Sequence, residues 1–358
     1  MNVKRGRAIT TRIIGRLGRM IDHPLRLLAA RSPMFASVYW CLMSGSFRRE
    51  HFAVACGMAR YAADCASPRG CRYLLRRNIH RIEKGLLMRP FRDLFALDYI
   101  RETVVCYDRM ARAAADGCAD TDEHELLWAH DVLSSYFAAA GDHPAIASAR
   151  SLFDLVEHPC AHPDRLDGPY ARDLGKPPPV SYDALLELAH RRRSVRWYRQ
   201  ERVPREMIDR AVELAALSPS GCNRQAFEFR IFDEPDLARR VASIPQGTGG
   251  FCENLPVVVA LVGKLRAYSD ARDRHLIYID GGLAAMSFVL ALETLGLSSC
   301  CLNWPDVGDQ EREMVSLLNL EPDERVVLLI AVGYPDPEGM VATSRKKSLE
   351  RLRRYNLP

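Results

Sequence analysis

Three consecutive prolines, Pro177-Pro178-Pro179, limit the folds open to this chain more than any other feature of the sequence. Proline fixes φ and removes a backbone donor, so a run of three holds the chain extended and excludes helix. Further prolines precede the run, and we predict that residues 158–180 form a linker. A chain of 358 residues is long enough for two domains. We therefore predict one domain over residues 1–157 and a second over residues 181–358.

The segment before the linker has the apolar spacing of helices and no strand signals. Apolar residues recur every three or four positions, as in the group Leu94, Leu97, Ile100, Val104 and Tyr107. Glycine or proline interrupts the pattern at residues 68–70, Gly85, Pro90, Gly117 and residues 141–144. The pattern predicts an all-α domain of about five helices.

Cations gather at the start of the second half, in Arg191-Arg192-Arg193-Ser194-Val195-Arg196. Arginine offers a planar fork of donors that fits phosphate oxygens, and serine adds a short donor. After a helical pattern, residues 218–225 read Ser-Pro-Ser-Gly-Cys-Asn-Arg-Gln, and the strand-like segment 227–232 follows. Amide groups on a rigid turn can hydrogen-bond a polar heterocycle. The two motifs suit a ligand with a phosphate and a polar ring.

These motifs resemble those of the FMN-dependent nitroreductase superfamily. Three later segments resemble the family in the same order: Asn254-Leu255-Pro256 before an apolar run, Asp280-Gly281-Gly282-Leu283-Ala284-Ala285, and Gly333-Tyr334-Pro335 followed by Arg345-Lys346-Lys347. The resemblance covers residues 181–356. It implies an α+β fold class, a nitroreductase-like sandwich whose central sheet is flanked by helices, here preceded by the all-α N-terminal domain.

The resemblance also implies that FMN is bound without covalent attachment. Arg192 and Ser194 would hold its phosphate, with Arg345 or Lys346 completing the cage. Arg196 would approach the pyrimidine side of the ring, where reduction places negative charge. The partner subunit would supply the turn that lines the ring. The predicted cofactor-binding residues are Arg192, Arg193, Ser194, Arg196, Pro219, Ser220, Asn223, Gln225, Arg345 and Lys346.

The function that the resemblance implies is an FMN-dependent oxidoreductase, fed by NAD(P)H, that reduces or dehydrogenates an organic small molecule. One alternative is a relative that stores flavin or consumes FMNH2 with oxygen. Another is a non-enzymatic interaction protein with a vestigial flavin fold. The chain departs from the family at Leu302-Asn303-Trp304-Pro305, where a glycine-containing turn is usual, so the donor to flavin N5 is not assigned. No nucleophile, metal set or acid pair fixes a further reaction, and catalytic residues stay unassigned.

One segment of the helical half, residues 78–86, combines several polar groups beside Gly85. His80 and Glu83 lie one helical turn apart and could face a substrate or the other domain. The alternative is an ordinary helix end, in which Lys84 complements the dipole and Glu83 pairs with an arginine. The segment faintly resembles an N-terminal extension of nitroreductase-like proteins associated with surface polysaccharide synthesis, which suggests a role in that biosynthesis.

The cysteines and the charge exclude several classes of protein. The 11 cysteines include no Cys-x-x-Cys pair, so we predict no metal site and a reducing cytoplasm. The net charge is +5, with six basic residues and no acid between Lys4 and Arg19. No nucleic-acid motif accompanies them, and we predict no nucleic-acid partner. Their amphipathic spacing leaves open peripheral contact with the inner face of the membrane.

The segment from Ile277 to Leu295 predicts a long helix that is apolar on nearly every side. Such a helix must be buried all round, and a single domain of this size offers too few layers to cover it. We therefore predict a homodimer with this helix at its centre, as the resemblance also implies.

Overall fold

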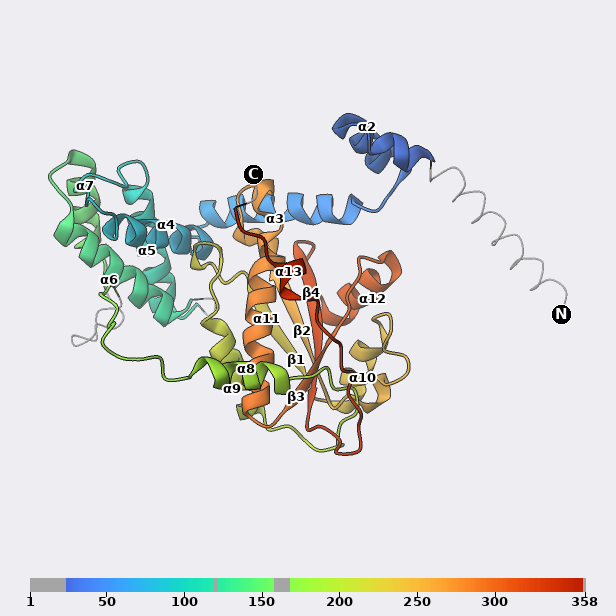
Figure 1. Ribbon diagram of the computed structural model, residues 1–358. Helices are drawn as coiled ribbons and strands as arrows, with labels where there is room; N and C mark the ends of the chain where they lie inside the picture. The colour runs from blue at the N-terminus through green and yellow to red at the C-terminus, as the bar shows by residue number, and fades with distance from the viewer. Residues whose placement is uncertain (1–23, 119–120, 158–167, 357–358) are drawn as a thin grey trace. The chain divides into compact units, whose positions relative to one another are not determined.

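The computed structural model describes residues 24–118, 121–157 and 168–356, and the chain divides into two compact units, Met1–Ala55 and Cys56–Pro358 (Figure 1). The described part of the first unit holds the short helix α2 (Pro33–Val38), which Ser32 caps, and the π-helical turn η1 (Tyr39–Met43). Several of its large apolar side chains are exposed, among them Met34 and Leu42. The basic segment 4–19 lies outside the described residues.

The rest of the N-terminal part is helical, as predicted. Its helices are α3 (Arg48–Ala66), which contains the boundary between the units, α4 (Arg72–Leu86), α5 (Ile100–Ala115), α6 (Glu123–Ala139) and α7 (Pro144–Phe153). Helices α4 to α7 share a core of fully buried side chains that includes Leu75, Ile79, Val104, Leu133 and Ile146. No strand occurs among residues 56–118 and 121–157.

The prediction that Leu94 and Leu97 belong to a helix is wrong. Residues 87–99 form no helix, and α5 begins only at Ile100. The loop contains Ala96 at φ 60°, which no right-handed helix accommodates. The predicted helix break at Gly85 is not seen, because α4 continues to Leu86. A Cβ on Gly85 would lie 2.1 Å from the ring of Phe95, so this glycine permits close packing.

The second half contains a four-stranded antiparallel sheet of order β1-β2-β4-β3. The strands are β1 (Phe227–Phe232), β2 (Val257–Lys264), β3 (Ser298–Leu302) and β4 (Glu324–Gly333). Strand β4 is central, and its continuous apolar run is typical of a strand buried on both faces. Strand β3 begins at Ser298 and ends at Leu302. The chain leaves the ladder after Leu302, and Pro305, three positions further on, has no N–H to donate.

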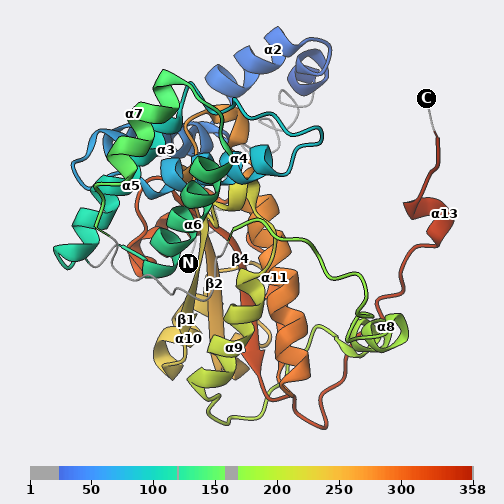
Figure 2. The same cartoon turned by 90° about the vertical axis from the view of Figure 1, so that its left-hand side faces the viewer.

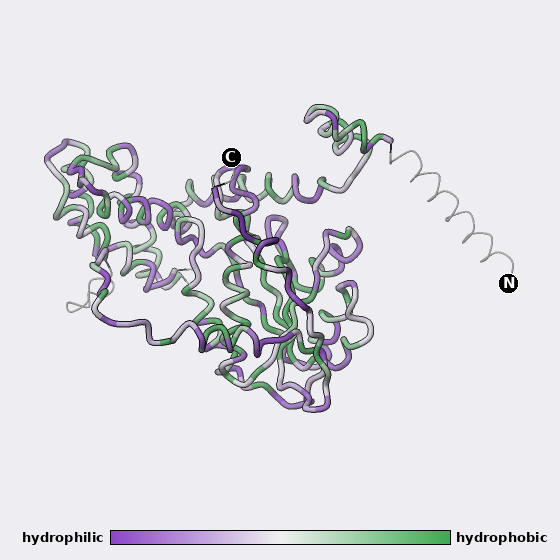
Figure 3. Tube along the Cα trace, in the orientation of Figure 1, coloured by the Kyte–Doolittle hydropathy of each residue, from purple (hydrophilic) through white to green (hydrophobic). Residues whose placement is uncertain are grey.

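Two layers of helices cover this sheet, which confirms the predicted α+β sandwich. Along β2, the side chains of Val257, Val259 and Leu261 pack against α9 (Arg205–Ala216) and α11 (Leu276–Thr294). The alternate residues Val258 and Ala260 pack against α10 (Pro235–Ser243) and α12 (Gly308–Leu318). This two-residue period is what a strand buried on both faces requires. Figure 3 shows the apolar strands and α11 in green within the sandwich.

Helix α11 is not covered all round by its own chain. Phe288 and Leu292 are fully buried against the sheet, whereas Ile279, Leu283 and Met286 are 55%, 44% and 47% exposed. These three follow each other at helical spacing and lie on one face. Within the described residues, Ala271–Thr294 is the one helical stretch long and apolar enough to cross a bilayer, and half of it is buried inside the structure. It serves here as the core helix of the sandwich.

The described part of the predicted linker, residues 168–180, forms no helix or strand, and Tyr170 and Leu174 are exposed. Residues 158–167 lie outside the described residues. The division into domains at 158–180 stays a prediction.

Candidate functional site

The first half of the predicted phosphate site begins where α8 (Tyr182–Arg191) ends. The Ser181 hydroxyl starts this helix by accepting a hydrogen bond from the Ala184 N–H at 3.2 Å. The backbone then turns extended at Arg192, and the Val195 N–H donates to the Ser299 carbonyl at 3.1 Å. This bond fixes the basic cluster beside β3, the edge strand of the sheet.

A cavity of ≈ 540 Å³ opens between this cluster and the C-terminal segment. Figure 2 shows that segment passing beside α8 on its way to α13 (Leu349–Leu352). The structure thus brings together six of the predicted cofactor-binding residues, from two stretches far apart in the sequence. The cavity is lined by Ala189, His190, Arg192, Arg193, Ser194, Arg196, Ala342, Thr343, Ser344, Arg345 and Lys346.

The cations of this cavity have no carboxylate partners among the described residues. Arg191 does not line the cavity, and its Nε is paired with Glu293 at 2.9 Å. No described acid forms an ion pair with the five basic side chains that do, which are Arg192, Arg193, Arg196, Arg345 and Lys346. A cluster of this kind repels itself unless an anion binds, and phosphate is the anion that guanidinium groups fit best. The donors present therefore fit the phosphate of a flavin nucleotide.

The Ser194 side chain hydrogen-bonds the thiol of Cys300, which is 3% exposed. Burial raises the pKa of this thiol, and the nearby Arg196 and the bond to Ser194 only partly oppose the rise. Cys300 is therefore a protonated, buried side chain at neutral pH and not a thiolate nucleophile.

Arg196 is positioned by a second family-like segment. The Asn254 Nδ2 donates to the Arg196 carbonyl at 2.9 Å, and Gln200 bonds the Asn254 side chain at 3.0 Å. The Arg196 guanidinium lies 5.7 Å from the centre of the Phe251 ring, at the end of the glycine-rich loop 246–250. The Asn-Leu-Pro motif thus holds the backbone of the cation predicted to approach the flavin ring.

The second predicted motif forms a tight turn at the start of β1. The Ser220 Oγ accepts from the Gln225 N–H at 3.0 Å, and Asp280 accepts from the Gly221 N–H at 2.9 Å. Cys222, Asn223 and Gln225 all have φ near 50°. This left-handed conformation costs energy in residues other than glycine, so the surroundings must hold it.

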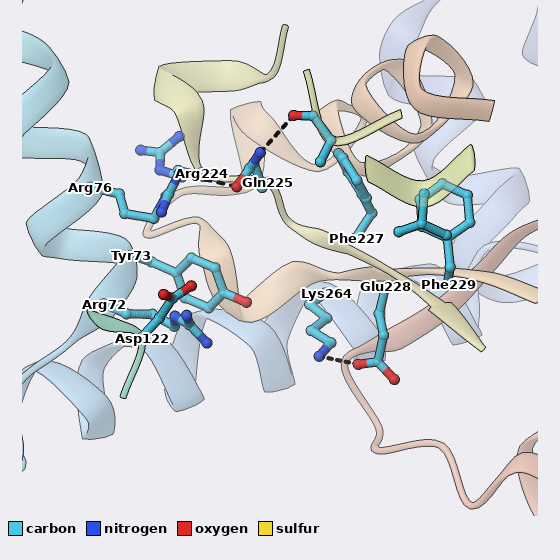
Figure 4. A pocket seen from close by; sticks show the side chains of 12 residues that line it. Arg72, Tyr73, Arg76, Asp122, Arg224, Gln225, Phe227, Glu228, Phe229 and Lys264 are labelled. Atoms are coloured by element: carbon cyan, nitrogen blue, oxygen red, sulfur yellow. Dashed lines mark hydrogen bonds and ion pairs between the residues drawn. The ribbon is translucent and has the colours of Figure 1, made fainter. Parts of the chain in front are cut away.

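Arg76 of α4 holds this turn, and sequence reasoning did not find it. Its Nε donates to the Asn223 carbonyl at 2.6 Å and its NH2 group donates to the Gln225 side chain at 3.2 Å (Figure 4). Behind it, Glu125 accepts from Arg76 at 3.4 Å and the Trp128 ring lies 5.2 Å from the guanidinium. Nothing in the local sequence pairs a helix arginine with a turn some 150 residues away.

The polar groups of the 78–86 segment form a local network. Glu83 accepts from the Trp128 indole at 3.0 Å and lies 3.6 Å from His80 Nδ1. The prediction that Glu83 pairs with an arginine is wrong, because Glu83 contacts Trp128 and His80 instead. Through Trp128 the network supports Arg76, and so the turn.

The turn formed by residues 218–225 does not contribute to the cavity that holds the basic cluster. None of Pro219, Ser220, Asn223 and Gln225 lines the cavity that holds the cations. Among the described residues, no group of three or more His, Cys, Asp or Glu side chains is arranged to hold a metal ion.

Comparisons with known proteins agree with the motifs. The nitroreductase family model matches residues 189–247 and 243–334. Iodotyrosine deiodinase 1 of Pongo abelii is 23% identical over 196 residues, which are 47% of this chain and 67% of that protein. Iodotyrosine deiodinase of Thermotoga neapolitana is 28% identical over 177 residues, 42% of this chain and 89% of that protein.

Among solved structures, an FMN-dependent nitroreductase from Clostridium difficile R20291 aligns with 48% of this chain and 99% of its own, at 22% identity and a TM-score of 0.41. The family match spans the basic cluster, the turn, the Asn-Leu-Pro segment and the long core helix. Residues 189–334 of this chain are thus similar to the nitroreductase family.

Proposed function

We propose that this protein is an FMN-dependent oxidoreductase that takes electrons from NAD(P)H and passes them to an organic small molecule. The observation that carries the proposal is the cavity lined by five cations without carboxylate partners among the described residues. Bound there, FMN would supply reversible two-electron chemistry.

The protein residues would bind and orient this cofactor. Arg192, Ser194, Arg345 and Lys346 would hold the phosphate through charge-assisted hydrogen bonds. Arg196, fixed by Asn254, would place a permanent positive charge beside the ring, where it favours the reduced state. The Cys300 thiol behind Ser194 stays protonated and takes no part in electron transfer.

We propose further that the protein is a homodimer, in which the exposed face of α11 formed by Ile279, Leu283 and Met286 packs against its counterpart. An apolar face of this kind is stable in water only when covered. The same association would bring the Pro219 to Asn223 turn of one subunit over the flavin held by Arg192 of the other. A cytoplasmic location follows from the predicted reducing environment of the free cysteines.

The substrate class stays open. Two of the relatives described above are named iodotyrosine deiodinases, so reductive removal of halide from an aromatic ring is one reaction to assay alongside nitro reduction. None of these relatives bears on a role in surface polysaccharide synthesis, which stays a prediction.

The test is Arg192→Ala, with Arg240→Ala as the control for loss of an exposed arginine. A charge-assisted hydrogen bond contributes about 1.5–3 kcal/mol, so the FMN dissociation constant of Arg192→Ala should rise at least about tenfold. Fluorescence titration of the apoprotein with FMN measures it, and Arg240→Ala should match the wild type. An unchanged constant in Arg192→Ala would overturn the phosphate assignment. Anaerobic bleaching of the bound flavin by NADPH then distinguishes an oxidoreductase from a protein that only stores flavin.

A further inference from the structure

A second cavity, of ≈ 320 Å³, lies where α4 meets β1 (Figure 4). It shares Arg224 and Gln225 with the turn described above and no residue with the phosphate cavity. Helix α4 contributes three side chains to its wall, and the segment from Arg224 to Phe229 contributes most of the others. The cationic and aromatic side chains of the lining include Arg72, Tyr73, Arg76, Arg224, Phe227 and Lys264.

Arg224 has no partner that accounts for its burial. It is 5% exposed, its Nε makes no hydrogen bond, and no carboxylate pairs with it in the part of the chain that the structure describes. Its guanidinium lies 5.0 Å from the centre of the Tyr268 ring, a contact that replaces only part of its hydration. Asp280 is near enough to attract this guanidinium electrostatically, but the hydrogen bonds that it accepts come from the Gly221 N–H and the Tyr268 hydroxyl. An unpaired buried cation is costly, and an anion in the cavity would relieve the cost.

The other cations of the cavity are only partly neutralised. Arg72 and Arg76 share one buried carboxylate, Glu125, at 3.1 and 3.4 Å. Lys264 pairs with Glu228, and Asp122 caps α6 by accepting from the His124 N–H. Two guanidinium groups on one carboxylate, next to the unpaired Arg224, leave the arginine side of the cavity positive.

The opposite side of the cavity is aromatic. Figure 4 shows Phe227 and Phe229 at the far side from the three arginines, and both are partly buried. Val212 and Ala216 of α9 complete this apolar wall. A cavity with cations on one side and aromatic rings on the other suits a ligand whose anionic group is attached to an apolar or flat body.

A third cavity, of ≈ 360 Å³, adjoins this one and shares Arg72, Tyr73 and Lys264 in its wall. It adds Arg60, Arg69 and Arg266, with Asp64 as its one lining carboxylate among the described residues. Arg60 pairs with Asp64 and Glu321. Arg266 pairs with Asp323 and Glu324, so this adjoining cavity adds less positive charge than its lining alone indicates.

We propose that the cavity between α4 and β1 binds a phosphate-bearing small molecule. Its phosphate would lie against Arg224 and Arg72, and any ring it carries would pack on Phe227 and Phe229. The two cavities have no residue in common, but Gln225 belongs both to this cavity and to the turn predicted to line the flavin ring, so the ligand is tested on the FMN-loaded protein.

Isothermal titration of the FMN-loaded full chain with AMP, inorganic phosphate and adenosine tests this. AMP or phosphate should bind, adenosine should not, and Arg224→Gln should raise the dissociation constant at least about tenfold. Arg240→Ala, an exposed arginine that lines neither cavity, should leave binding of the same ligand unchanged. Tighter binding of AMP identifies an organic phosphate, and tighter binding of phosphate identifies the free ion.

Arg72→Met provides a second variant on the arginine side of the cavity, in case Arg224→Gln fails to fold. Arg76 still pairs with Glu125 in this variant. It should also weaken binding. The proposal is overturned if neither AMP nor phosphate binds, if adenosine binds as tightly as AMP, or if a folded Arg224→Gln or Arg72→Met protein binds like the wild type.

Discussion

At the scale of single residues, Arg72 and Arg76 make a matched pair. Both bond the buried Glu125, but only Arg76 also bonds Asn223 and Gln225 of the strained turn. Arg76→Met and Arg72→Met should each lower the free energy of unfolding by about 1–3 kcal/mol, since each removes a bond to a buried charge. Only Arg76→Met should also weaken FMN binding, because only it releases the turn. Urea unfolding and FMN titration measure the two effects, and equal loss of FMN affinity in both variants would contradict the assignment.

Asp280 carries a pH-dependent contribution to stability. Burial is the largest influence on this carboxyl and raises its pKa above the ordinary 3.8, against the bonds from Gly221 and Tyr268. A raised pKa means that the folded state keeps the proton to higher pH than the unfolded chain. The resulting stabilisation is complete below pH 3.8 and is lost as pH rises through the folded-state pKa.

Asp280→Asn keeps an oxygen acceptor but removes this titration. The free energy of unfolding of the wild type, relative to Asp280→Asn, should therefore fall as pH rises from about 4 to 7. Urea unfolding of both proteins at several pH values checks it. A difference that stays constant or grows with pH would show that the charged carboxylate is the favoured form in the fold.

At the scale of helices and strands, sequence periodicity located elements well and their ends less well. The apolar runs of β2 and β4 are unambiguous, because a strand buried on both faces admits little else. The spacing of Leu94 and Leu97 wrongly predicted a helix, since helical spacing also occurs by chance in loops. The conformation of this loop is decided by Pro90 and by the close approach of Phe95 to Gly85. Strand β3 ends at Leu302, and beyond it the Trp304 indole donates to Glu311 of α12, a contact that the local sequence does not show.

The candidate site was predictable only in part for the same reason. Arg192, Ser194 and Arg345 were predicted from short motifs, because binding of a phosphate requires several donors of these types close together. Arg76 and Arg224 could not be found in this way. Their roles depend on the docking of a helix against a turn, which no local pattern encodes.

At the scale of the whole molecule, the proposed homodimer predicts complementation between two inactive variants. Arg192→Ala removes a phosphate donor, and Asn223→Gly removes a ring-lining side chain while tolerating φ of 50°. The two proteins, unfolded and refolded together, would form heterodimers in which one site receives both wild-type contributions. NADPH-dependent flavin reduction should then return in the mixture. Each variant refolded alone is the control, and heterodimers proven by tag capture that stay inactive would exclude a shared site.

The C-terminal wall of the phosphate cavity has one more consequence. Residues 338–348 form no helix or strand, and Arg345, Lys346 and Lys347 are exposed there. Trypsin cleaves after such residues only where the backbone is free to enter the active site of the protease. A ligand that engages Arg345 and Lys346 would hold this stretch against α8 and delay the cut. Cleavage at the C-terminal stretch thus reports, without any assay of turnover, what fraction of the molecules carries a ligand.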